Sequence, residues 1–217
     1  MTCYVKKARA VAALKKMSHF YIALATLYKK HGLTVNEDIG RRNILMSSLQ
    51  EKYFAEEIDT TFPGTVANGK TGEPDIIIPA LNRELECKLT SKNRSGSWAL
   101  QSDYNTLRRK GAVDHLYVLA SDDFDEFAVL FFEGLTVKDF HPPASGSKGK
   151  SRINFRHALA KCTVVFGEMN DKSEQFLLAA GQVLADPTST HTALEKARAR
   201  IDYWSTRSNI SFGLEAL

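Results

Sequence analysis

Asp75, Glu86 and Lys88 are the residues whose types and spacing best suit chemistry in this sequence. If Ala80 and Leu81 form a two-residue hairpin turn, Asp75 and Glu86 face each other across two antiparallel strands. Opposed carboxylates repel each other, at a cost of up to about 1 kcal/mol, so we expect a cation between them. Magnesium prefers oxygen ligands and fits that position, and Lys88 adds a fixed positive charge beside it.

Successive side chains of a strand point to opposite faces of a sheet, so this hairpin is expected to have one charged and one apolar face. The charged face carries Asp75, Glu84, Glu86 and Lys88. The apolar face carries Ile76, Ile78, Leu85, Cys87 and Leu89. The apolar face belongs to a core. The charged face forms either a metal site or a surface ladder of salt bridges.

The order Pro74-Asp75, a short spacer, then Glu86-Cys87-Lys88 resembles the signature of the PD-(D/E)XK nucleases, with every motif position filled. The resemblance implies a restriction-endonuclease-like αβββαβ core and magnesium-dependent hydrolysis of phosphodiester bonds. It also implies that Asp75, Glu86 and the backbone carbonyl of Cys87 ligate the metal. In that family pattern Lys88 orients or activates the attacking water.

By size the chain looks most like a type II restriction endonuclease, a prokaryotic enzyme of the cytoplasm. This resemblance implies site-specific cutting of double-stranded DNA by a homodimer, since cutting a palindrome takes two sites related by a two-fold axis. A cognate methyltransferase in the same system is a further implied partner. Two alternatives stay open: a structure-specific, repair or phage nuclease of the same superfamily, and a noncatalytic DNA-binding or nucleotide-binding module.

The elements that must position these residues follow from the spacing of apolar side chains. Helices are expected at residues 4–30, 41–58, 101–110, 154–161, 172–185 and 190–204. Strands are expected at residues 75–79, 83–90, 115–120, 127–132 and 162–166, and a loop at 142–150. These strands are too apolar to leave either face in water, which predicts an α/β fold with a mixed central sheet of about five strands flanked by helices. We expect one nuclease domain over 1–217, comprising a helical extension at 1–40, a catalytic core at 41–167 and C-terminal helices at 168–217.

A third carboxylate, Glu51, falls in the middle of the apolar stripe of the helix expected at residues 41–58. An unpaired carboxylate on a buried face is costly, so Glu51 needs a cation or strong donors nearby. Nucleases of the resembled family often carry such an acidic residue close to the metal. The alternative is a glutamate at the stripe's edge that pairs with Lys52 or an arginine. Glu56 and Glu57 are expected to be solvated.

Positive charge is concentrated in two segments, although the net charge of the chain is only +4. One comprises the first fifty residues, and the other is the acid-free stretch 141–161. Such segments suit a polyanion such as DNA, although a solvated surface explains them equally well. The candidate DNA-binding residues are Lys148, Lys150, Arg152, Arg156 and, just after the motif strand, Gln101.

Residues 144–151, ASGSKGKS, also match the loose pattern of a phosphate-binding P-loop. A P-loop directly follows a buried strand, whereas two prolines precede this segment. We therefore expect a loop that grips DNA phosphates, or a plain solvated loop, in preference to a nucleotide site.

Composition excludes several other classes of protein. With 43% hydrophobic and 25% charged residues, the chain is predicted to fold. Its three cysteines form no CxxC pair, which argues against a disulfide framework or zinc site and fits a reducing cytosol. No apolar run is long enough to span a membrane, so we expect a soluble protein without a membrane partner. Serine, cysteine and histidine form no convincing nucleophile and base set.

Overall fold

The computed structural model describes residues 3–70, 73–92, 98–145, 149–171, 173–205 and 210–217. The chain divides into two compact units, one made of Met1–Gly167 with Leu214–Leu217 and the other of Glu168–Gly213. Residues 168–217 were expected to be C-terminal helices of a single domain. In the structure, most of that segment forms a unit of its own, and only the last four residues return to the first unit.

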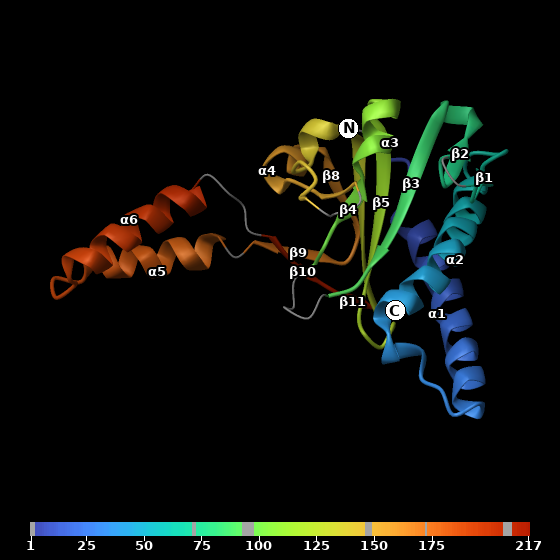
Figure 1. Ribbon diagram of the computed structural model, residues 1–217, viewed down its shortest axis with the longest axis horizontal. Coiled ribbons are helices and arrows are strands. Elements are labelled where there is room, and N and C mark those ends of the chain that lie inside the picture. Colours follow the sequence, from blue (N-terminus) through green and yellow to red (C-terminus); the bar gives the residue numbers. More distant parts are fainter. Residues whose placement is uncertain (1–2, 71–72, 93–97, 146–148, 172, 206–209) are drawn as a thin grey trace. The chain divides into compact units, whose positions relative to one another are not determined.

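A seven-stranded mixed sheet forms the centre of the first unit (Figure 1). Its strand order is β1-β2-β3-β5-β6-β11, and β8 also pairs with β6. Only β3 and β5 run parallel to each other, and the remaining pairs are antiparallel. The strands are β1 (Val66–Ala67), β2 (Ile76–Ile78), β3 (Arg83–Thr90), β5 (Val113–Ala120), β6 (Glu126–Leu135), β8 (Cys162–Phe166) and β11 (Glu215–Ala216). This architecture confirms the predicted α/β class with a mixed sheet flanked by helices.

Two long helices cover one face of the sheet, α1 (Lys7–Lys30) and α2 (Ile39–Asp59) (Figure 1). Their inward residues join the core with the apolar face of β2, β3 and β5. Every residue of β5 is buried, as expected for a strand covered on both faces. Shorter elements complete the unit: α3 (Tyr104–Lys110), α4 (Phe155–Ala158), and single turns of 3-10 helix at Val35–Glu37, Pro79–Leu81, Val137–Asp139 and Leu159–Lys161. In the part of the chain that the structure describes, no helix has the length and apolar character needed to cross a membrane.

The motif hairpin has the predicted register but a different turn. Ile76 pairs with Leu85, and Ile78 pairs with Arg83, as expected if Asp75 lies opposite Glu86. The two-residue turn is wrong, because Pro79–Leu81 forms a turn of 3-10 helix and Asn82 closes it with a positive φ of 49°. Asparagine tolerates this left-handed conformation better than most residues do.

The helix expected at residues 101–110 is wrong in its first turn. Gln101–Asp103 is a short strand, β4, and it pairs with β7 (Lys150–Arg152), which lies at the end of the expected loop. The helix begins only after Asp103, whose side chain accepts a hydrogen bond of 2.6 Å from the Thr106 amide. This N-cap satisfies a free amide of the first turn and so sets the start of α3. The two strands form a separate β4–β7 ribbon outside the main sheet.

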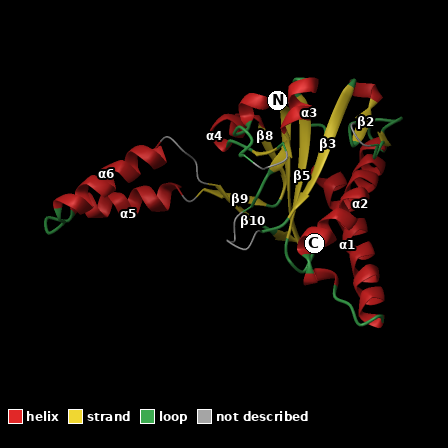
Figure 2. Cartoon of the chain, in the orientation of Figure 1, coloured by secondary structure: helices red, strands yellow, loops and turns green. Residues whose placement is uncertain are grey.

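The second unit is a pair of helices joined to a two-stranded ribbon (Figure 2). The helices α5 (Ser173–Ala185) and α6 (His191–Ser205) agree closely with the expected ranges. The ribbon was not predicted. It pairs β9 (Glu168–Asp171) with β10 (Ile210–Gly213) in antiparallel order.

Candidate active site

The motif hairpin brings Asp75, Glu86 and Lys88 together. Lys88 Nζ lies 2.6 Å from Glu86 Oε1 and 3.7 Å from Asp75 Oδ2. Glu86 and Lys88 share a face of β3 because they are two residues apart, and Asp75 immediately precedes the paired strand β2. The cation expected between the two carboxylates is therefore supplied by the Lys88 ammonium in this structure.

Burial and mutual charge set the protonation of this group. Burial raises the pKa of Asp75, and Glu86 adds to this effect, while Lys88 and the Cys87 amide oppose it. Burial alone would lower the pKa of Lys88, but Glu86 and Asp75 outweigh it and the pKa is raised. The Lys88 ammonium is thus kept charged by the same carboxylates that it neutralises.

Glu51 lies close enough to this group to share its electrostatics. Its pKa is raised to about 7, first by burial and then by the Asp75 charge, with Lys88 opposing and Glu86 adding a smaller increase. Among the described residues, no lysine or arginine forms an ion pair with Glu51, and Lys52 instead lies 3.9 Å from Glu56. The alternative in which Lys52 neutralises Glu51 is therefore not what the structure shows.

The orientation of α2 explains the position of Glu51 and shows that the prediction of a solvated Glu57 was wrong. The buried stripe of α2 runs through Met46, Gln50 and Phe54, so Glu51 lies beside it and not in its middle. Glu57 was expected to be solvated but is only 7% exposed. It contacts Lys16 at 2.8 Å and Arg9 at 3.5 Å across the α1–α2 interface. A carboxylate buried in this way is tolerated because it is paired.

A cavity of about 650 Å³ joins the motif to other candidate residues. Asp75, Lys88 and Glu51 line it, whereas Glu86 does not. From the β4–β7 ribbon, Gln101 and Lys150 line the same cavity. Gln101 and Lys150, two of the predicted DNA-binding residues, therefore line the same cavity as Asp75 and Lys88.

The remaining nominated DNA-binding residues are placed less completely. Arg152 is exposed on β7 and pairs with Gln101 in the ribbon register. Lys148 lies outside the described residues, and so does the side chain of Arg156. Lys150 begins a strand, whereas the residue types of a P-loop lead into a helix. The described part of this segment therefore lacks the geometry of a P-loop.

The carboxylate oxygens of the site are the ligand type that magnesium prefers, but they do not surround a common point at which an ion would be fully coordinated. Within the described ranges, no three His, Cys, Asp or Glu side chains are close enough to hold a metal ion. Magnesium, however, is usually held by one or two carboxylates together with water and substrate phosphate oxygens. Asp75 and Glu86, already grouped around a positive charge, satisfy that smaller requirement.

Three buried polar residues near the site were missed by sequence reasoning: Gln50, Ser102 and His115. Gln50 is fully buried in α2, and its Nε2 donates to the Leu116 carbonyl at 3.2 Å. Its Oε1 has no hydrogen-bond partner among the described residues. The sequence did contain a signal for Gln50, since a glutamine on the apolar stripe of a helix is expected to be buried and hydrogen-bonded to nearby backbone.

Ser102 and His115 form a contact that resembles a nucleophile and base pair. Ser102 Oγ lies 2.9 Å from His115 Nε2 and lines the cavity. Burial, however, lowers the pKa of His115 to about 4, and Nδ1 contacts the Val113 carbonyl where a hydrolase triad has a carboxylate. This imidazole is too weak a base to activate serine at neutral pH.

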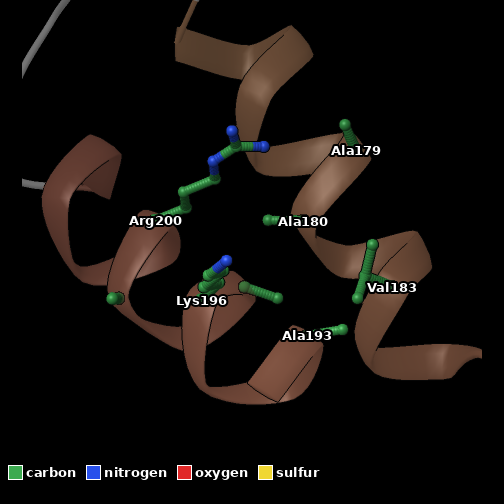
Figure 3. Close-up of a pocket in the computed structure, with 8 residues that line it drawn as sticks. Ala179, Ala180, Val183, Ala193, Lys196 and Arg200 are labelled. Carbon is green, nitrogen blue, oxygen red and sulfur yellow. The ribbon is translucent and has the colours of Figure 1, made fainter. Parts of the chain in front are cut away.

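The second unit contains a separate cavity of about 510 Å³ between α5 and α6 (Figure 3). Small apolar side chains such as Ala180 and Val183 line it, together with Lys196 and Arg200. Among the described residues that line it, there is no carboxylate, histidine or cysteine.

Comparison of the chain with protein-family models, curated proteins and solved structures found no match. The kinship with PD-(D/E)XK nucleases thus stays a prediction from the motif.

Proposed function

We propose that this protein is a magnesium-dependent deoxyribonuclease of the PD-(D/E)XK type. The observation that carries the proposal is the grouping of Asp75 and Glu86 around the Lys88 ammonium, with Glu51 lining the same cavity as Asp75 and Lys88. A surface ladder of salt bridges would not need a half-buried third carboxylate with a raised pKa beside it.

Each residue has a distinct role in the proposed reaction. Asp75 and Glu86 would hold magnesium, together with the Cys87 carbonyl and Glu51. The bound ion supplies charge neutralisation at the scissile phosphate and a more acidic water. Lys88, kept charged by its two carboxylates, positions the attacking water or stabilises the negative charge that develops on the phosphate.

The proposed substrate is double-stranded DNA, cut at a specific site by a homodimer. Lys150 and Gln101 support a polynucleotide substrate because they place a cation and an amide in the cavity that contains Asp75. Exposed Arg152, on the same ribbon, extends the positive charge beyond the cavity. A cognate methyltransferase is the partner that such an enzyme requires.

The test is a digest of several phage and plasmid DNAs by the purified protein, with magnesium and, separately, with manganese. Discrete fragments are expected. A smear, or cutting only at junctions, flaps or ends, would replace site-specific cutting with the structure-specific, repair or phage nuclease. Absence of cleavage on every DNA with both metals would contradict the nuclease proposal.

One observation favours a second candidate, a noncatalytic DNA-binding module. Lys88 already neutralises both carboxylates, so the ion-pair group is satisfied without a metal. In such a module, Asp75→Asn would leave every measurable DNA interaction unchanged and no DNA would be cut. In the nuclease, the same change lowers the cleavage rate by about 100-fold or more while DNA binding without metal persists.

A further inference from the structure

The β4–β7 ribbon carries Gln101 and Lys150 to the cavity, yet it does not belong to the central sheet. Its strands pair with each other through Gln101 with Arg152 and Asp103 with Lys150. Outside the ribbon, the Arg152 carbonyl accepts a hydrogen bond of 2.9 Å from the His141 amide. Backbone hydrogen bonds from Tyr104 to Gly149 and from Ile153 to Leu100 close the ribbon at its two ends. The bonds between the two strands do not fix where the ribbon lies over the sheet, and the bond from His141 ties down the Arg152 end of β7.

A serine–histidine contact links the ribbon to β5. His115 is fully buried, and its Nδ1 lies 3.0 Å from the Val113 carbonyl, which can only accept. Nδ1 therefore carries the proton of the neutral ring, and Nε2 is an acceptor. The Ser102 hydroxyl accordingly donates to Nε2 across 2.9 Å.

A second contact lies two residues further along the same face of β5. The Tyr117 hydroxyl donates to the Gln101 carbonyl at 3.1 Å. The rings of His115 and Tyr117 are stacked, with centroids 5.9 Å apart and an interplanar angle of 11°. Two adjacent ribbon residues are thus bonded to two stacked rings.

The same rings are tied to the motif by strand register. In the parallel pairing of β3 with β5, His115 is the partner of Glu86, and Tyr117 is the partner of Lys88. Side chains at paired positions of neighbouring strands lie on the same face of the sheet. Each ring therefore stands beside one motif residue and bonds one ribbon residue.

We infer that His115 and Tyr117 are positioning residues that hold the β4–β7 ribbon at a fixed place over the motif, so that Gln101 and Lys150 line the cavity of Asp75 and Lys88. The inference rests on the proposed function in one respect, that Gln101 and Lys150 bind the substrate. His115 is not among the residues that line the cavity, whereas Tyr117 is. The positioning effect of both rings passes through Ser102 and the Gln101 backbone.

The variants that test the inference remove single hydroxyl groups and keep the packing. Ser102→Ala and Tyr117→Phe each delete one ribbon bond, and Ser102→Thr restores a donor at the same position. Tyr4→Phe is the matched control, because it deletes a buried hydroxyl that donates to Asp114 at 3.0 Å and makes no ribbon contact. It removes a hydrogen bond elsewhere in the unit that is at least as strong, because its acceptor is a carboxylate.

Amide hydrogen exchange of the DNA-free protein tests the positioning without any activity. Exchange in residues 100–104 and 149–153 is expected to become about fivefold faster in Ser102→Ala and Tyr117→Phe, the factor for losing one ordinary hydrogen bond. Ser102→Thr and Tyr4→Phe should leave ribbon exchange at the wild-type rate. Unchanged ribbon exchange in both deletion variants would overturn the inference, whether or not the protein cleaves DNA.

Steady-state kinetics and a double-mutant cycle separate positioning from a merely structural role. Ser102→Ala is expected to raise KM about fivefold with kcat within about twofold of wild type. Combined with Lys150→Ala it should add little, because a displaced ribbon has already lost the Lys150 contact. Fully additive effects, or an unchanged KM, would overturn the inference. Faster ribbon exchange in a protein that cuts no DNA would support the positioning and refute only the proposed nuclease.

Discussion

The backbone amide of Cys87 donates a hydrogen bond of 2.7 Å to Asp75 Oδ2. The bond links the residue before β2 to the middle of β3, beyond the last paired position of the hairpin. One contact therefore both extends the strand pairing and aims the carboxylate toward Lys88. The place of Asp75 at the site is fixed by backbone, and its charge can be altered without moving it.

Asp75→Asn is predicted to separate shape from charge. The amide oxygen of asparagine can still accept the Cys87 hydrogen bond, so folding should be retained. Loss of the charge should lower the cleavage rate by about 100-fold or more, the usual cost of removing an electrostatic group from an active site. Circular dichroism and initial cleavage rates measure the two effects. A variant with wild-type cleavage would exclude Asp75 from the metal site.

Glu51→Gln is predicted to stabilise the metal-free protein at alkaline pH. Because the pKa of Glu51 is raised from 4.5 to about 7 in the folded state, its ionisation opposes folding. The cost is absent below about pH 4.5, grows up to about pH 7 and is full above it. Thermal unfolding without metal should therefore show a higher Tm for the variant at pH 8 and an equal Tm at pH 4.

Magnesium should reverse this advantage, because the ion favours the charged carboxylate that glutamine lacks. The variant should gain less Tm from magnesium than wild type does, and it should need more magnesium for a lower rate of cleavage. Glu56→Gln is the control on the same helix, since Glu56 is exposed and pairs with Lys16 and Lys52. Equal magnesium-dependent shifts in wild type and Glu51→Gln would remove Glu51 from the metal site.

Basic residues of segment 148–152 are predicted to set the salt dependence of DNA binding. Removing Lys148, Lys150 and Arg152 together should reduce the slope of log K against log salt by about one unit for each lost phosphate contact. Lys7→Ala serves as the control, because exposed Lys7 pairs with Glu215 on β11 and not with a ribbon residue. Binding in EDTA at several salt concentrations gives the slopes. If wild type and the triple variant have the same slope of log K against log salt, these residues do not contact DNA.

The buried His115 is predicted to weaken the fold as the pH falls. Burial lowers its pKa from 6.5 to about 4, with Glu86 and the Val113 carbonyl opposing and Lys88 assisting. A neutral imidazole in the folded state contributes stability that is full above about pH 6.5 and is lost down to about pH 4. The loss is about 3 kcal/mol by the ordinary conversion of pKa into free energy.

Urea unfolding between pH 7 and pH 4 measures that loss. His115→Gln should be less stable at pH 7 and should lose less stability with falling pH than wild type does. His19→Gln, at an exposed position of α1, should follow the wild-type curve. A wild-type curve without a fall between pH 6.5 and pH 4 would contradict a buried neutral His115.

The motif could be read from the sequence because its geometry is local. Alternation along β2 and β3 fixes which side chains share a face, and the opposition of Asp75 and Glu86 requires only the register. The predicted register is correct although the predicted turn is wrong, because the 3-10 turn at Pro79–Leu81 and Asn82 still places Ile78 opposite Arg83. The partial burial of Glu51 could also be predicted, because the periodicity of the helix places this residue close to the buried face of α2.

The rest of the site depends on contacts between distant segments. The β4–β7 ribbon consists of polar strands of three residues each. Neither strand is long enough to show the alternation of apolar and polar residues from which a strand is predicted. The bond between Ser102 and His115 joins two elements whose packing no local pattern encodes. Glu57 looked solvated because the Lys16 and Arg9 partners that bury it come from another helix.

Cleavage by Lys88→Ala is the sharpest test of whether Asp75, Glu86 and Lys88 form a nuclease active site. Lys110→Ala is the matched control, because Lys110 pairs with Glu84 at 3.0 Å, and Glu84 lies only two residues before Glu86 on β3. With magnesium and a DNA that wild type cuts, Lys110→Ala should retain its rate, whereas Lys88→Ala should lose about 100-fold or more with DNA binding intact. Equal cleavage by wild type and Lys88→Ala would contradict the assignment of this cluster as a nuclease active site.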